Sequence, residues 1–121
     1  MKPTSQVAKL KRLIEKSLGD DKAQDVVAID LTGKSSLADY MIVASGTSRK
    51  HITTVADHIV ERLKGLGRST LPVEGREVSD WVVIDAGAII IHLFRPEARR
   101  HFGLEKMWAM PEPAAALEAA L

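Results

Sequence analysis

Residues 40–48 read Tyr-Met-Ile-Val-Ala-Ser-Gly-Thr-Ser, and this stretch decides the fold. Its first six residues are mostly apolar and predict a strand over 40–45. Gly46, Thr47 and Ser48 then predict the start of a helix, because a serine at this position accepts a hydrogen bond from the first backbone amides. The helix is expected to reach about Leu66, since one apolar face repeats at helical spacing through Ile52, Val55, Ile59 and Leu63.

The sequence before and after this stretch predicts further strands and helices. We expect a helix over 5–18, a strand over 25–31, a short extended segment over 69–74, strands over 81–85 and 89–94, and a helix over about 97–108. A strand followed by a helix and another strand needs a crossover, which favours a parallel pair in the middle of the sheet. The predicted fold is therefore α/β, with a single mixed β-sheet flanked by helices.

Length and composition limit the classes of protein that fit. The 121 residues suit one domain, which we place over 1–110, followed by a tail over 111–121 that is a frayed helix or disordered. The net charge of +1, from 17 basic and 16 acidic residues, is too small for a protein that coats nucleic acid or an anionic membrane. The chain has no cysteine, which excludes disulfides and thiolate metal sites and fits a reducing compartment. No signal peptide precedes the first helix, so we expect a cytoplasmic protein.

Gly46-Thr47-Ser48 is the strongest candidate for an anion site. Free amides at a helix start attract phosphate, and a glycine-serine turn before a helix also occurs in nucleotidyltransferases. Those enzymes need closely spaced carboxylates to hold metal ions, whereas the sequence has no Asp-x-Asp or Asp-x-Glu and the first turns of the helix that follows offer only Asp57. The alternative interpretation is that Ser48 is a plain N-cap. We predict no catalytic residue and no cofactor, and a nucleotide-binding enzyme remains an alternative.

Metal and nucleic-acid sites have weaker signals. The four histidines contain no pair three or four residues apart, so we predict no metal site. A basic cluster over 95–101 contains Arg95, Arg99, Arg100 and His101, and it is a candidate contact with RNA. Glu97 and Glu105 interleave with it, which favours a solvated helix face.

Two interpretations of Trp81 remain open, because a tryptophan at a strand start either fills a core or anchors an interface.

The chain resembles the ribosome silencing factor family, also called the Iojap-related proteins. The resemblance covers about residues 7–108 and is carried by several stretches in order. They are residues 38–48 (ADYMIVASGTS) with His51, Glu74-Gly75, residues 81–87 (WVVIDAG), residues 92–94 (HLF), Arg100, and residues 104–108 (LEKMW).

The resemblance implies both fold and function. It implies a nucleotidyltransferase-like fold without nucleotidyltransferase activity. It also implies binding to the large ribosomal subunit on ribosomal protein fourteen, where the bound factor sterically blocks joining of the small subunit and represses translation under nutrient limitation. The partner-binding residues carried over are Tyr40, Glu74, Trp81, Asp85, His92 and Arg95.

Two departures from the family lie near this surface. Ala88 stands where relatives often have an acidic residue, and Gly103 stands where they usually have an aromatic one. We expect a minor contact with ribosomal RNA in addition to the protein contact. An exposed edge strand would also let two copies of the chain pair as a homodimer.

Overall fold

The computed structural model of the protein describes residues 5–67 and 71–103. Eight elements follow one another along the chain: α1 (Ser5–Asp20), β1 (Gln24–Asp30), β2 (Tyr40–Ser45), α2 (Arg49–Lys64), β3 (Val73–Glu74), β4 (Trp81–Asp85), β5 (Ile89–Phe94) and α3 (Pro96–Phe102). The order of helices and strands is the predicted one. None of the helices in the described ranges is long and apolar enough to cross a membrane.

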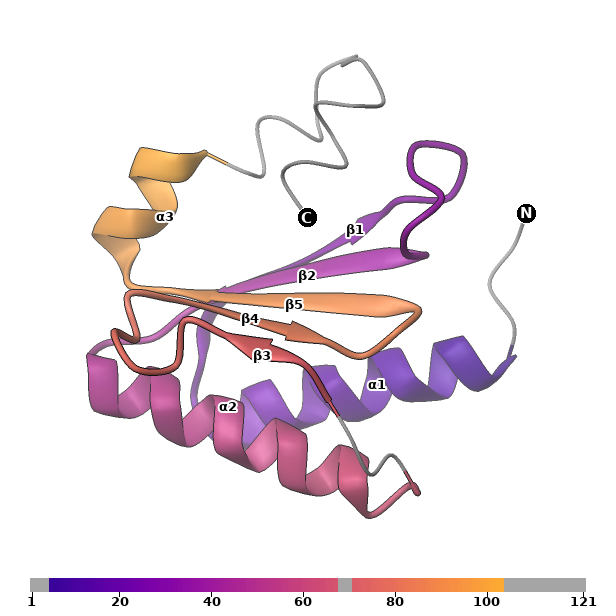
Figure 1. Cartoon of the computed structure of the whole chain (residues 1–121), viewed down its shortest axis with the longest axis horizontal. Coiled ribbons are helices and arrows are strands. Elements are labelled where there is room, and N and C mark those ends of the chain that lie inside the picture. The colour runs from indigo at the N-terminus through magenta and orange to yellow at the C-terminus, as the bar shows by residue number, and fades with distance from the viewer. Residues whose placement is uncertain (1–4, 68–70, 104–121) are drawn as a thin grey trace.

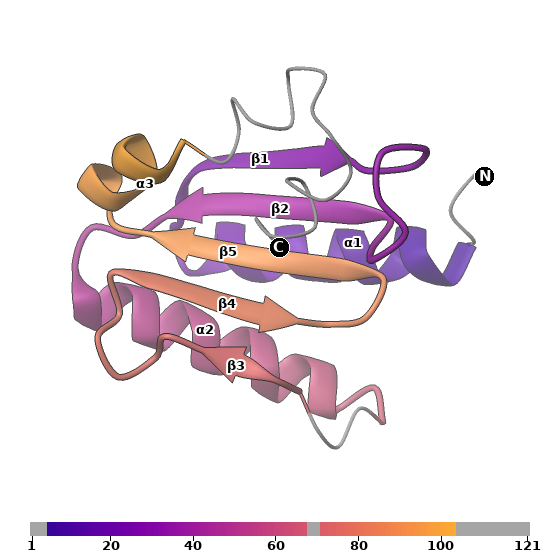
Figure 2. The same cartoon turned by 45° about the horizontal axis from the view of Figure 1, so that its top comes forward.

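The strands form one mixed sheet in the order β1-β2-β5-β4-β3 (Figure 2). β2 and β5 pair in parallel along their whole length, from Tyr40 opposite Ile89 to Ser45 opposite Phe94. The other three pairings are antiparallel. The predicted parallel pair in the middle of the sheet is therefore confirmed, and the crossover from β2 to β5 contains α2, β3 and β4.

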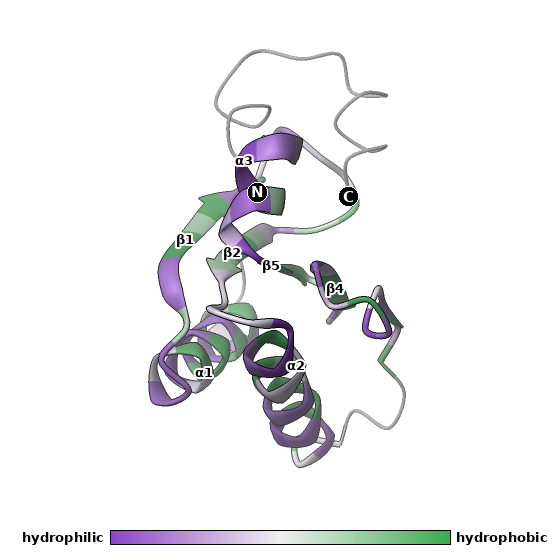
Figure 3. Cartoon of the chain, turned by 90° about the vertical axis from the view of Figure 1, so that its left-hand side faces the viewer, coloured by the Kyte–Doolittle hydropathy of each residue, from purple (hydrophilic) through white to green (hydrophobic). Residues whose placement is uncertain are grey.

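Two helices cover one face of this sheet. Figure 1 and the end-on view of Figure 3 show α1 and α2 side by side below the strands, with α3 on the other side. We call the side toward α1 and α2 the helix face and the other side the opposite face. The main core lies on the helix face because alternate residues of each strand point toward the helices. Its buried members include Leu10, Ile14 and Leu18 of α1, Ile52, Val55, Ile59 and Leu63 of α2, and Ile42, Ile84, Ile89 and Ile91 of the sheet.

A second, smaller apolar cluster lies on the opposite face. Its buried members are Leu31, Ala38, Met41, Val43, Ile90 and Phe94, and Ala98 of α3 packs against it. Leu31 and Ala38 belong to the loop between β1 and β2, whereas Ala98 approaches from the end where β5 leads into α3. The sheet is thus apolar on both sides, which explains why all six residues of β5 are buried.

Local chemistry sets the helix boundaries. α2 begins after Ser48, whose side chain accepts a hydrogen bond from the amide of His51, and it ends at Gly65. α1 continues past Gly19 to Asp20, although the sequence predicted an end at Leu18. The prediction for α3 was wrong at its end, because Gly103 adopts the left-handed conformation (φ 59°) and stops the helix at Phe102. Residues 104–108, which the prediction included in that helix, lie outside the described residues.

Gly46 gives a direct test of the packing between sheet and helix. A Cβ atom at position 46 would collide with Cγ1 of Ile52, whereas a Cβ at Gly19 would meet nothing within 4 Å. We expect Gly46→Ala to lower the free energy of unfolding by about 1–3 kcal/mol, because Ile52 must leave its buried position. Gly19→Ala should leave stability unchanged or raise it by up to about 1 kcal/mol, because alanine favours the helix. Urea unfolding of both variants measures the difference, and equal stabilities would contradict this account.

Candidate functional site

Four of the six candidate partner-binding residues lie on the opposite face of the sheet. Residues directly paired across two strands point to the same side. Trp81 pairs with Phe94 and Asp85 with Ile90, which places both on the side of the second cluster. His92 and Glu74 each pair with Val83, so they share that side. We call Glu74, Trp81 and Asp85 the docking residues, whereas His92 is buried beneath them.

The other two candidates lie elsewhere. Tyr40 is half-buried against the main core on the helix face, and the ammonium nitrogen of Lys11 lies 5.4 Å from the centre of its ring. Arg95 follows β5 and precedes α3, so it lies at the edge of the sheet beside Trp81. The structure therefore brings Arg95 to the docking residues and separates Tyr40 from them.

Trp81, His92 and Phe94 form an aromatic group on the opposite face. The rings of Trp81 and Phe94 are stacked with centroids 5.0 Å apart, and the rings of His92 and Phe94 lie 6.0 Å apart and nearly parallel. The indole Nε1 of Trp81 donates a hydrogen bond of 2.8 Å to Nδ1 of His92. These contacts fix the orientation of the half-buried indole, so Trp81 serves both as core and as surface.

His92 is neutral in this environment. Because Nδ1 accepts the indole hydrogen bond, the ring proton belongs on Nε2. The side chain is fully buried, and burial lowers the pKa of His92 from its ordinary value of 6.5 to about 4. His92 was predicted as a partner contact, whereas its full burial and its hydrogen bond give it the role of holding Trp81 in place.

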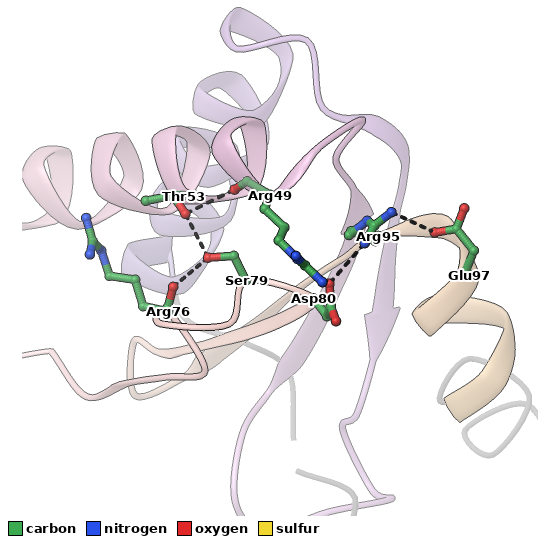
Figure 4. A network of polar contacts seen from close by, with 7 residues as sticks. All are labelled: Arg49, Thr53, Arg76, Ser79, Asp80, Arg95 and Glu97. Carbon is green, nitrogen blue, oxygen red and sulfur yellow. Dashed lines mark hydrogen bonds and ion pairs between the residues drawn. The ribbon is translucent and has the colours of Figure 1, made fainter.

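Asp80 joins three elements at one end of the sheet (Figure 4). Its Oδ1 atom accepts hydrogen bonds from Nε of Arg49 at 3.1 Å and from Nη1 of Arg95 at 3.3 Å. The hydrogen bond from Arg49 is the main cause that holds the pKa of Asp80 below its ordinary value, and Arg95 adds to it. The backbone amide of Arg95 also donates to the carbonyl oxygen of Asp80. The start of α2, the start of β4 and the start of α3 are thereby held together.

The loop between β3 and β4 is fastened to α2 by further polar contacts. Arg76 donates two hydrogen bonds to the carboxylate of Asp57, and the hydroxyls of Ser79 and Thr53 lie 2.8 Å apart. Gly75 has a φ of +84°, and a Cβ there would collide with the carbonyl oxygen of Trp81. A glycine is therefore required at this point for the loop to pass close to β4.

A shallow hollow of about 500 Å³ lies beside Trp81. Its lining combines the indole with the exposed side chain of Val78 and with the charged groups of Asp80 and Arg95. Gly75, Glu97, Ala98 and His101 complete it. Val78, with 62% of its surface exposed, was not predicted from sequence, because a single valine between polar turn residues gives no periodic signal. The hollow can accept an apolar or cationic side chain of a partner.

Acidic side chains border the same face. Glu74 and Asp85 are both exposed, and they lie on the neighbouring strands β3 and β4. Oδ1 of Asp85 accepts a hydrogen bond of 2.9 Å from the amide of Gly87, so this carboxylate also shapes the turn between β4 and β5. The docking residues thus combine a fixed aromatic group with negative charge.

Three backbone amides at the candidate anion site before α2 donate hydrogen bonds to groups of the protein itself. The amide of Gly46 donates to the carbonyl oxygen of Phe94, the amide of Thr47 donates to Nδ1 of His51, and the amide of His51 donates to the hydroxyl of Ser48. The interpretation of Ser48 as an N-cap is therefore confirmed. In the described ranges, no three histidine or acidic side chains come together as a metal site would require.

The predicted basic cluster also has internal contacts. Nη1 of Arg99 donates to the hydroxyl of Ser45 at 2.8 Å, and Arg95 contacts Asp80 as described above. Arg100 and His101 are exposed on α3. Two of its three arginines thus help to seat α3 at the end of the sheet.

These features define a small α/β domain that presents an aromatic and acidic surface on one face of a mixed sheet. Among known families, the model described as "Ribosomal silencing factor during starvation" matches residues 4–120. The chain belongs to this ribosomal silencing factor family, so the predicted resemblance is confirmed.

Individual relatives agree with this assignment. The chain is 48% identical over 99 residues to the ribosomal silencing factor of Zymomonas mobilis, covering 82% of this chain and 74% of the relative. It is 34% identical over 100 residues to the mitochondrial Iojap-related protein of Arabidopsis thaliana, covering 79% of this chain and 54% of the relative. A crystal structure of a Chromobacterium violaceum protein superposes with a TM-score of 0.81 at 30% identity and covers 88% of each chain.

The buried His92 predicts a particular dependence of stability on pH. The unfolded chain binds a proton on this histidine near pH 6.5, whereas the folded chain resists it down to about pH 4. The neutral form of His92 therefore contributes fully to the free energy of unfolding above pH 6.5. This contribution is lost as the pH falls toward 4, by about 3 kcal/mol in total. Unfolding by urea at a series of pH values measures this loss.

His92→Gln is the matched control, because a neutral amide can accept the indole hydrogen bond but does not titrate. Its free energy of unfolding should change less than that of the unaltered protein between pH 6.5 and 4, with the other three histidines present in both. Identical slopes over this window would contradict the assignment to His92.

Proposed function

We propose that this protein binds the large ribosomal subunit through ribosomal protein fourteen and thereby blocks joining of the small subunit, repressing translation when nutrients are limited. Membership of the ribosomal silencing factor family supports a ribosomal partner. One observation supports this location of the contact: Glu74, Trp81 and Asp85 lie on the same face of the sheet. The hydrogen bond from Trp81 to His92 fixes the indole there. Arg95 joins them at the edge.

The chemistry of this face suits a basic protein partner. Tryptophan and arginine are the residues that most often dominate interface energies, and a rigid indole loses little entropy on binding. Glu74 and Asp85 supply negative charge to complement lysine and arginine side chains of the ribosomal protein. Exposed Arg100 on α3 is our candidate for a minor contact with ribosomal RNA.

The proposed mechanism is occlusion, with no bond made or broken. A bound domain of this size occupies surface that the small subunit needs, so repression follows from binding alone. We propose that the scaffold is nucleotidyltransferase-like but has no nucleotide site, and the use of the Thr47 and His51 amides within the chain supports this. The proposed place of action is the cytoplasm, and the proposed functional domain spans 1–110.

Binding to isolated large subunits tests the proposed surface. We expect Trp81→Ala to weaken binding at least about 30-fold, which corresponds to a hot-spot loss of about 2 kcal/mol. Glu74→Lys should weaken it roughly tenfold or more through repulsion by a basic partner. Co-sedimentation with purified subunits and a subunit-joining assay provide the two measurements.

Glu61→Lys is the matched control, because it makes the same charge reversal at an exposed position on α2, on the other side of the sheet. It should bind and inhibit joining as well as the unaltered protein. Normal binding by Glu74→Lys and by a correctly folded Trp81→Ala would refute the surface. Unchanged subunit joining at saturating protein would refute the function.

We also propose that two copies of the chain pair through β1. This strand lies at the edge of the sheet, and Val26 and Val27 are each 36% exposed there. Within residues 5–67 and 71–103 no strand pairs with the outer side of β1, and an open edge with apolar side chains favours strand pairing with another chain. Sedimentation at several concentrations should show a dimer that Val26→Lys dissociates, whereas a monomer at all concentrations would end this proposal.

A further inference from the structure

The hollow beside Trp81 presents apolar surface to solvent. Among its described lining residues, Val78, Trp81 and Ala98 contribute apolar side chains. Val78 is 62% exposed, and the indole of Trp81 is half-buried. Covering such side chains removes apolar surface from water, which favours association. The hollow therefore offers a driving force for binding that does not depend on charge.

The charged groups in the lining already have partners within the chain (Figure 4). Oδ1 of Asp80 accepts hydrogen bonds from Arg49 and Arg95, and Nη2 of Arg95 lies 3.8 Å from Oε2 of Glu97. A cationic side chain entering the hollow would approach the positive charge of Arg95 and would have to compete with two arginines for Asp80. An apolar side chain requires no such competition. The lining therefore favours an apolar occupant over a cationic one.

The segments that line the hollow are held in place by contacts within the chain. The backbone amide of Arg95 donates a hydrogen bond of 3.0 Å to the carbonyl oxygen of Asp80, which joins two of these segments. The positive φ of Gly75 brings the loop between β3 and β4 close to the backbone of Trp81, and the hydrogen bond to His92 fixes the indole. A preformed hollow loses little conformational entropy when a side chain enters it.

We propose that this hollow receives one large apolar side chain, such as leucine or phenylalanine, from a protein segment that also carries basic residues. The apolar lining selects the inserted side chain, because an apolar anchor in a pocket is a common centre of a protein interface. The basic neighbours are expected because exposed carboxylates lie close by. Glu74 directly precedes Gly75 of the lining, and the side chain of Glu97 is 68% exposed. This inference rests on the proposed function, since it names the chemistry of the partner segment that meets the docking residues.

Val78→Asp distinguishes the two kinds of occupant. A carboxylate at this exposed position opposes an apolar side chain, whereas it would attract a cationic one. We expect Val78→Asp to weaken binding to purified large ribosomal subunits at least about tenfold in co-sedimentation. Unchanged binding would overturn the inference. Tighter binding would assign the hollow to a cationic side chain and would equally overturn it.

Leu66→Asp is the matched control, because it makes the same kind of change at a residue with 60% of its surface exposed. Leu66 follows α2 and lines a different hollow together with Leu10 and Leu13 of α1. This variant should bind as tightly as the unaltered protein, and an equal loss in both variants would contradict the assignment to the hollow.

The same assay separates this inference from the proposed function. Weaker binding by Trp81→Ala together with normal binding by Val78→Asp would overturn the apolar anchor and leave the proposed function intact. Absence of binding by the unaltered protein would refute the proposed function, and the inference with it.

A double variant provides a further measurement. If one side chain contacts both Val78 and Trp81, the losses from Val78→Asp and Trp81→Ala share the same contact and are not independent. The double variant should then bind within about threefold of Trp81→Ala alone. A loss equal to the product of the two single losses would overturn the inference.

Discussion

The parallel pairing of β2 with β5 is the constraint on which the rest of the structure depends. It aligns Ser45 with Phe94, so both strands end at the same edge of the sheet. α2 and α3 begin directly after these ends, and their N-termini therefore lie close together. The carboxylate of Asp80 lies at this edge, where it contacts Arg49 and Arg95 from the two helix starts. A negative group is favourable at this position because helix N-termini carry partial positive charge.

Because side chains alternate along each strand, the residues that build the core and the docking residues point to different faces of the sheet. In β4, Val82 and Ile84 enter the main core, whereas Trp81 and Asp85 point to the other side. β4 thus stabilises the domain through Val82 and Ile84, and its alternate residues Trp81 and Asp85 form part of the proposed docking surface. A change in the surface set leaves the packing against α1 and α2 intact, which makes the docking residues suitable for mutational analysis.

Much of this architecture could be predicted from sequence. The strands over 40–45, 81–85 and 89–94 have the predicted bounds, because apolar runs flanked by glycine or polar turns are clear signals. The end of α3 was not predicted, since it depends on the backbone conformation of Gly103 rather than on periodicity. The contacts of Asp80 with Arg49 and Arg95 were also missed, because they join residues far apart in the chain. Sequence reasoning grouped Tyr40 with Trp81, and only the register shows that they face different sides.

The crossover between β2 and β5 has a consequence for how such a domain can vary. Glu74, Val78 and Trp81 all come from the segment between α2 and β5, and in the sheet β4 and β3 of this segment both lie beyond β5. Within this segment β4 pairs with β5 along its whole length, whereas the loop between β3 and β4 is held to α2 mainly by the ion pairs of Arg76 with Asp57 and of Asp80 with Arg49. The length and composition of this loop can therefore change while β4 and the central strands remain, provided these ion pairs are kept. Recognition of a new partner would then require changes in this loop, while the paired strands keep their positions.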